Sequence, residues 1–235
     1  MALFEKKFCD ICGAKIGLLG NRKLEDGNMC KDCAALLSPF MTDRRRTTLA
    51  DIKEHLAYRE ANKGQVATFN PTKTIGNRTK VIFDEDKGRF IVSSSNQWRN
   101  ENPDVIMFSQ VTGCNIDIDE DRNEIKTKDK DGNEVSYNPP RYEYEYDFNV
   151  IIQINSPWFN EIKIKINNIS VKKASIDYRE CERIANDIKQ TLTTIRSESR
   201  ENATPKVAMT CPSCGATTIP DINGRCEYCG SAVLR

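Results

Sequence analysis

Four pairs of cysteines, each with two residues between its members, are the side chains best suited to chemistry. The pairs are Cys9 and Cys12, Cys30 and Cys33, Cys211 and Cys214, and Cys226 and Cys229. Four thiolates at about 2.3 Å suit a tetrahedral Zn²⁺ ion. The spacing predicts one four-cysteine zinc site at each end of the chain. An alternative pairing joins the first pair to the last, at a larger cost in loop closure.

Both predicted sites have the composition of structural rather than catalytic zinc. Four cysteines complete the coordination sphere, whereas catalytic zinc keeps one position open for water or substrate. The chain has one histidine, no glycine-rich phosphate loop and no nucleophile elbow. We therefore expect no enzymatic activity.

The bulk composition indicates a cytoplasmic protein. The formal net charge is +1, so no overall field attracts nucleic acid or an anionic membrane. No apolar run approaches the roughly 18 residues of a membrane span. The N-terminal residues lack the apolar core of a secretory signal. Cysteines in the cytoplasm stay reduced, which favours metal ligands over disulfides.

Several other reactive side chains receive structural interpretations. Cys181 falls on an apolar helical stripe, and Cys114 has no neighbouring cation to lower its pKa. We interpret His55 as a surface or boundary residue. The run Asp117-x-Asp119-x-Asp121 is interpreted as a solvated turn, because it lacks the glycine and the glutamate of a calcium-binding loop.

The basic and aromatic residues are interpreted in the same way. The triplet 44–46 is expected to be a solvated linker and not a phosphate-binding patch, because no aromatic side chains interleave it. Lys163 and Lys165 could face a phospholipid headgroup, but pairing with acidic residues of a neighbouring strand accounts for them. Trp98 and Trp158 are expected to pack under loops.

The cysteine motifs carry two resemblances. Cys9-Asp-Ile-Cys12-Gly with Cys30-Lys-Asp-Cys33 resembles a small zinc-ribbon family found at the N-termini of uncharacterised bacterial proteins and catalogued as a domain of unknown function. This resemblance covers residues 1–40 and implies the four zinc ligands. Cys211-Pro-Ser-Cys214-Gly with Cys226-Glu-Tyr-Cys229-Gly resembles the short zinc ribbons common at the ends of bacterial proteins.

Between the two modules the hydrophobic pattern predicts mostly strands. A helix is expected over residues 47–63, capped by Thr48 and ended by Gly64. Alternation of period two then predicts short strands, including a hairpin over 80–93. Further strands are expected on either side of a turn at 120–123, and a long strand follows Pro139 and Pro140. An apolar stripe predicts a last helix over 175–196.

About seven antiparallel strands followed by one amphipathic helix resemble the pleckstrin-homology-like (PH-like) barrel and its bacterial, GRAM-like relatives. The fold class is therefore α+β, mainly β, with a PH-like antiparallel barrel and a C-terminal capping helix, flanked by two small zinc ribbons. The competing arrangement is an ordinary antiparallel sheet covered by one helix. The expected divisions are a zinc ribbon at 1–40, a linker helix at 41–66, a PH-like domain at 67–197, a linker at 198–207 and a zinc ribbon at 208–235.

Two hypotheses for function follow. The favoured one is a non-enzymatic adaptor that binds a protein partner through a groove or sheet edge of the middle domain. The alternative is a regulator that binds nucleic acid through its zinc ribbons. The basic residues available for that are Lys15, Arg22, Lys23 and Lys31 in the first ribbon and Arg225 in the second. No transmembrane segment is expected, and lipid or peptide binding and the oligomeric state stay open.

Overall fold

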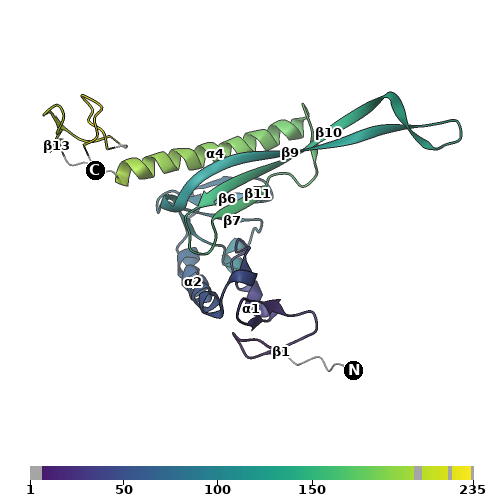
Figure 1. Cartoon of the computed structure of the whole chain (residues 1–235), viewed down its shortest axis with the longest axis horizontal. Helices are drawn as coiled ribbons and strands as arrows, with labels where there is room; N and C mark the ends of the chain where they lie inside the picture. Colours follow the sequence, from purple (N-terminus) through teal and green to yellow (C-terminus); the bar gives the residue numbers. More distant parts are fainter. Residues whose placement is uncertain (1–6, 204–207, 222–223, 234–235) are drawn as a thin grey trace.

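Two antiparallel four-stranded sheets and a long helix form the middle of the chain, with a cysteine-rich module at each end (Figure 1). The computed structural model describes residues 7–203, 208–221 and 224–233. These residues hold more strand than helix, in agreement with the predicted mainly-β class. The two sheets do not close into one. The PH-like barrel is therefore not confirmed and stays a prediction.

The two central strands of the first sheet are buried on both faces. Its strands are β5 (Lys73–Ile75), β6 (Lys80–Asp84), β7 (Arg89–Ser93) and β8 (Ile106–Met107), in that spatial order. Phe83 and Phe90 point into the main core, whereas Ile82 and Ile91 pack on the opposite face with Trp98. Strands β6 and β7 pair antiparallel, which confirms the predicted hairpin. Burial on both faces accounts for the three consecutive apolar residues at the centre of each strand, 81–83 and 90–92.

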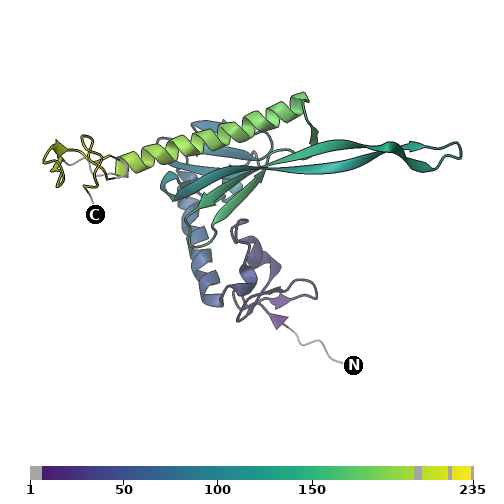
Figure 2. The ribbon, with the colours of Figure 1, turned by 45° about the horizontal axis from the view of Figure 1, so that its top comes forward.

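The second sheet is organised around one long hairpin. Its strands are β9 (Val111–Lys128), β10 (Glu134–Ile154), β11 (Glu161–Lys165) and β12 (Val171–Lys172). Strand β11 pairs with residues 149–153 of β10, and β12 pairs with residues 145–146. Farther out, among the described residues, β10 pairs with β9 alone. The two strands project there from the rest of the molecule as an arm (Figures 1 and 2).

The arm departs from the sequence prediction at two places. The turn expected at 120–123 is wrong, because these residues lie within β9 and pair with residues 143–146 of β10. Pro139 and Pro140 do not end the strand. A shift in register between Ser136 and Arg141 accommodates them, and such a bulge tolerates residues that have no backbone N–H.

Helix α4 (Ile176–Ala203) covers the core that both sheets share (Figure 1). The buried stripe comprises Cys181, Ile184, Ile188, Leu192 and Ile195. Ile176, an apolar residue within the helix predicted over 175–196, does not join the stripe and is 77% exposed at the first position of α4. The helix also runs through the first part of the predicted 198–207 linker, whose residues 204–207 lie outside the described chain.

Helix α2 (Leu49–Ala67) connects the N-terminal module to the first sheet. Thr48 caps it as predicted, in reciprocal hydrogen bonds with Asp51. The helix continues through Gly64 and does not end there. Ile52 packs into the core of the N-terminal module, and Val66 packs into the cluster behind the first sheet. One helix thus belongs to two cores.

The remaining elements are short. They are β1 (Lys7–Phe8), β2 (Lys15–Ile16), β3 (Arg22–Lys23), β4 (Asn28–Met29), α1 (Lys31–Ala35), η1 (Arg44–Arg46), α3 (Trp98–Glu101), η2 (Phe108–Gln110), β13 (Met209–Thr210) and β14 (Thr217–Thr218). Most of them belong to the two cysteine-rich modules. No helix of the described chain combines the length and the apolar character needed to cross a bilayer.

Two candidate metal centres

The four N-terminal cysteines converge on one point. The Sγ atoms of Cys9 and Cys33 are 3.8 Å apart, and those of Cys12 and Cys30 are also 3.8 Å apart. All four sulfur atoms lie within 4.8 Å of one another. A tetrahedron with metal–sulfur bonds of about 2.3 Å has edges of about 3.8 Å. The set therefore has the dimensions of a tetrahedral thiolate site.

The two halves of this N-terminal site are built differently. Cys9 and Cys12 lie on a tight turn in which Gly13 donates its N–H to the Cys9 carbonyl at 2.8 Å, with a φ of 72°. Only glycine adopts that angle without strain. Cys30 caps helix α1, and its Sγ accepts a hydrogen bond from the Cys33 backbone N–H at 3.3 Å. A helix N-terminus favours negative charge, so it stabilises the second pair of thiolates.

Backbone amides and neighbouring thiols shift the pKa values of this set in opposite directions. Burial raises the pKa of Cys9, but N–H groups of Cys12, Cys30 and Ile11 outweigh it and bring the pKa to about 6. Burial and the neighbouring thiols raise the pKa of Cys33. Four thiolates this close repel one another, and a divalent cation would remove that repulsion. The donor set therefore fits a zinc ion.

The C-terminal set has the same dimensions and a more symmetrical construction. Cys211 and Cys229 are separated by 3.6 Å, and Cys214 and Cys226 by 3.7 Å, between their Sγ atoms. Both pairs lie on tight turns. Gly215 and Gly230 follow them with φ values of 72° and 70°. The side-chain and backbone donors of Ser231 are the leading cause that lowers the pKa of Cys229 to about 6.

The eight predicted ligands thus come together as two sets, each within its own end of the chain. The alternative pairing across the two ends is wrong, because each set is complete within its own module. Both sets consist of four thiolates, so neither leaves a coordination position open. Their chemistry suits a structural metal ion, and zinc fits both.

The hydrophobic core of the N-terminal module extends beyond residue 40, the boundary predicted from the sequence. Its core contains Leu24, Met29 and Leu37 together with Ile52 of helix α2. Backbone contacts also join the two parts, because the Leu49 N–H donates to the Asp26 carboxylate at 2.7 Å. A metal ion held by this module would therefore be coupled to the packing of α2.

A buried polar junction links this module to the sheets, and sequence analysis did not find it. The Arg59 guanidinium lies 2.8 Å from the Asp104 carboxylate, with side chains that are 8% and 0% exposed. Ser38 donates its hydroxyl to the same carboxylate at 2.7 Å. A charged residue on an otherwise core-facing side of helix 49–67 was the available signal for Arg59.

His55 contradicts its interpretation as a surface or boundary residue. It is fully buried, and neither ring nitrogen has a hydrogen-bond partner among the described residues. Its ring stacks on Trp158 with centroids 4.9 Å apart. The stacking partner comes from the loop before β11, about a hundred residues along the chain. Helical periodicity alone gives no sign of that partner.

The other candidate residues lie outside both metal centres. Cys181 is buried in the main core, as predicted. Cys114 is half-buried, and burial raises the pKa of its thiol to about 11. The carboxylates of 117–121 lie on strand β9, not on a turn, and within the described residues they form no group with metal-ligand spacing. Trp98 is buried as expected, and Trp158 is half-buried.

Comparison with known proteins supports the N-terminal module alone. Residues 7–55 match the family described as "Domain of unknown function (DUF4428)". The match spans both cysteine pairs and the first turns of α2, which agrees with the packing that joins them. Among curated proteins and among solved structures, no match was found.

Proposed function

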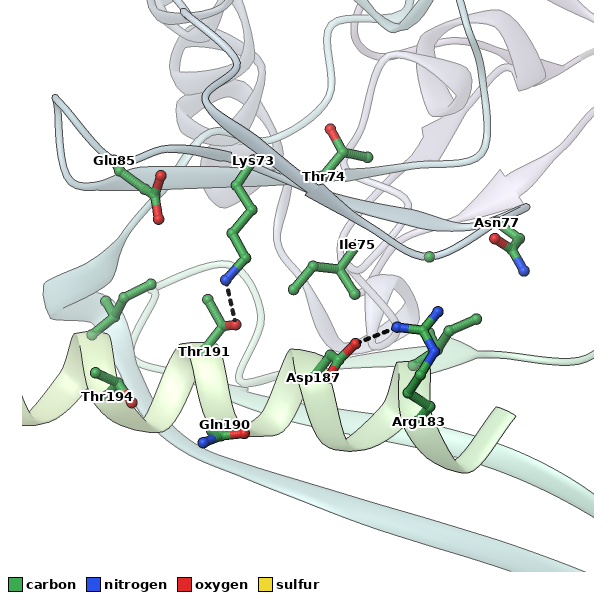
Figure 3. Close-up of a pocket in the computed structure, with 13 residues that line it drawn as sticks. Lys73, Thr74, Ile75, Asn77, Glu85, Arg183, Asp187, Gln190, Thr191 and Thr194 are labelled. Carbon is green, nitrogen blue, oxygen red and sulfur yellow. Dashed lines mark hydrogen bonds and ion pairs between the residues drawn. The ribbon is translucent and has the colours of Figure 1, made fainter. Parts of the chain in front are cut away.

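We propose that this chain is a non-enzymatic interaction protein. In this proposal two structural zinc ions stabilise its ends, and its middle domain binds a protein partner. The metal part is supported by the two closed sets of four cysteines. A reducing compartment such as the cytoplasm keeps such thiols available to zinc. The interaction part is supported by a groove between strand β5 and helix α4, shown in Figure 3.

The groove has a volume of about 710 Å³. One wall is β5 with the turn that follows it, and the other wall is a polar face of α4 (Figure 3). Lys73 on β5 donates to the Thr191 hydroxyl on α4 at 3.0 Å. Arg183 donates to Asp187 at 2.6 Å on the same face. The Lys73–Thr191 hydrogen bond bridges the two walls, so a segment that binds between them would have to displace it.

Strand β5 forms the edge of its sheet, with β6 as its neighbour among the described strands. An edge strand presents unpaired backbone N–H and C=O groups, which an extended peptide can pair with. A wall formed by a helix then contacts alternate side chains of that peptide. The edge position of β5 beside helix α4 is the observation that carries the proposal. The proposal also includes a PH-like fold for the middle domain, because its strands precede a covering helix.

The test is selection of peptides on the zinc-loaded full chain from a random display library, followed by affinity measurements on two variants. Thr194→Trp places a large side chain in the groove, because Thr194 lines it. Thr193→Trp is the matched control, since Thr193 is exposed and does not line the groove. We expect selected peptides to bind Thr194→Trp at least tenfold more weakly and Thr193→Trp unchanged. Failure to select any peptide, or equal loss in both variants, would contradict the proposal.

The nucleic-acid alternative receives less support from the arrangement of charge. In the C-terminal module Arg225 is the basic residue between the cysteine pairs. In the N-terminal module Lys15 and Lys31 line one cavity, and Arg22 and Lys23 line another. Binding through phosphates weakens steeply as salt increases. A gel-shift series over ionic strength with single- and double-stranded DNA tests this alternative.

A further inference from the structure

Four basic side chains from two distant segments meet at one cavity of the N-terminal module. Arg22 and Lys23 come from strand β3, between the two cysteine pairs. Arg44 and Arg45 come from η1, just before helix α2. Together with Asn21 they line a cavity of about 580 Å³. The sequence separates the two segments by twenty residues, so the cluster exists only through the fold of the module.

Within the described residues, no carboxylate forms an ion pair with this cluster. The lining contains no acidic side chain, and none of the four cations forms an ion pair. The neighbouring Arg46 differs in this respect, because it lies 3.7 Å from the Asp43 carboxylate and does not line the cavity. Like charges held this close repel one another, and a bound anion would relieve the repulsion.

Arg44 and Arg22 are half-buried, whereas Lys23 and Arg45 are exposed. The Nε atom of Arg44 is buried and has no hydrogen-bond partner in the described structure. Burial, followed by the charges of Arg22 and Arg45, lowers the pKa of Arg44. Arg22 is held in place by hydrogen bonds to the carbonyl oxygens of Leu19 at 3.2 Å and Asn21 at 3.3 Å. Two guanidinium groups with unused donors thus converge on the cavity.

We infer that this cavity binds a small phosphate-bearing ligand, such as a diphosphate or a phosphate ester. Guanidinium groups match the oxygens of a phosphate in planar, bidentate hydrogen bonds. Arg44 and Arg45 supply such donors from one side and Arg22 from the other, with Lys23 as an additional point charge. This site is separate from the groove at β5 and does not depend on the function proposed for that groove.

The shape of the cluster favours a compact phosphate over a nucleic-acid strand. The four cations line a single cavity, whereas Lys15 and Lys31 of the same module line a different one. No aromatic side chain lines the cavity, so there is no platform on which a base could stack. A strand of nucleic acid needs a run of cations along its backbone and aromatic side chains on which its bases can stack. A single ligand with two or three negative charges needs neither.

The test is isothermal titration of the zinc-loaded full chain with inorganic pyrophosphate at low salt. We expect one pyrophosphate per chain, and binding that weakens at least tenfold in Arg44→Gln and in Arg45→Gln. Arg46→Gln is the matched control, because it removes the same charge at the next position outside the cavity. Its affinity should stay within twofold of the parent. Arg45 is exposed, so Arg45→Gln tests the site even where Arg44→Gln disturbs folding.

Two further titrations distinguish the sources of phosphate. A single-stranded DNA of twenty nucleotides and vesicles containing an anionic phospholipid should bind more weakly than pyrophosphate at equal phosphate concentration. The inference is overturned by the absence of pyrophosphate binding in the millimolar range, or by equal losses in Arg45→Gln and Arg46→Gln. It is also overturned where DNA or vesicles bind more tightly than pyrophosphate and lose that binding in the same variants.

Discussion

Loss of the buried charge at the junction between the N-terminal module and the sheets should destabilise the chain strongly. In the native structure the Asp104 carboxylate is fully buried and accepts hydrogen bonds from Arg59 at 2.8 Å and from Ser38 at 2.7 Å. Arg59 also donates to the backbone oxygens of Leu36 at 3.2 Å and of Asn102. One guanidinium group thus connects three segments of the chain.

Arg59→Met removes the cation and leaves the carboxylate buried with Ser38 as its remaining side-chain donor. Removing one partner of a buried ion pair costs about 3–5 kcal/mol, because the other charge stays uncompensated. With a urea dependence of about 3 kcal/mol/M, the unfolding midpoint falls by about 1–1.7 M. The double variant Arg59→Met with Asp104→Leu removes both charges. Its cost should be less than the sum of the two single costs, by about 0.5–3 kcal/mol.

Urea unfolding of the zinc-loaded chain, followed by far-ultraviolet circular dichroism, measures these differences. Lys63→Met is the control on the same helix, because the Lys63–Glu60 pair is exposed, with side chains 60% and 73% accessible. An exposed pair contributes about 0–1 kcal/mol. A loss below 1 kcal/mol in Arg59→Met, or single costs that simply add in the double variant, would refute the reasoning.

Three further predictions concern metal, pH and backbone geometry. Native mass spectrometry should find two zinc ions in the full chain, one in Cys33→Ser and two in the core control Cys181→Ser, whereas a parent chain without metal would contradict both sites. Burial lowers the pKa of His55; the charge of Arg59 adds to this effect and the charge of Asp104 opposes it. The unfolded state therefore binds the proton more readily than the folded state. The free energy of unfolding should consequently fall as the pH drops below about 6.5. His55→Phe should flatten that fall, as measured by urea unfolding between pH 5 and pH 8, and an unchanged slope would count against it. Gly76 has a φ of 105° and faces the Thr79 carbonyl oxygen, so Gly76→Ala should cost more than about 1 kcal/mol. Gly64→Ala, which meets no neighbouring atom in helix α2, should stabilise the chain by up to about 1 kcal/mol, and the same sign for both alanines would contradict this account.

Features that depend on neighbouring residues could be predicted well. The eight cysteines come together as expected, because each C-x-x-C pair lies on a tight local turn or at a helix start. The helix cap at Thr48 and the buried stripe of α4 follow from the positions of a few side chains within one or two helical turns. The hairpin of β6 and β7 follows from two short apolar runs on either side of one turn. In each case the interactions that decide the structure join residues that are close together in the sequence.

Sequence reasoning failed where a residue's environment comes from elsewhere in the chain. Residues 120–123 carry turn-like polar side chains, yet pairing with 143–146 holds them in a continuous strand. Trp158 comes from the loop before β11 and stacks on His55, which buries a histidine expected near the surface. The start of β10 absorbs two prolines in a bulge, which composition does not distinguish from a strand end.

The amino-acid sequence by itself determined the two four-cysteine sets, the polar and apolar faces of the helices, and the mainly-β character of the middle. These properties are set by spacings of two to four residues, which local backbone geometry converts directly into structure. The tertiary structure alone decided that Arg22 and Lys23 meet Arg44 and Arg45, that Arg59 reaches Asp104, and that β5 forms an open edge beside α4. Such contacts depend on how whole elements pack, and the free energy of that packing is spread over many distant residues.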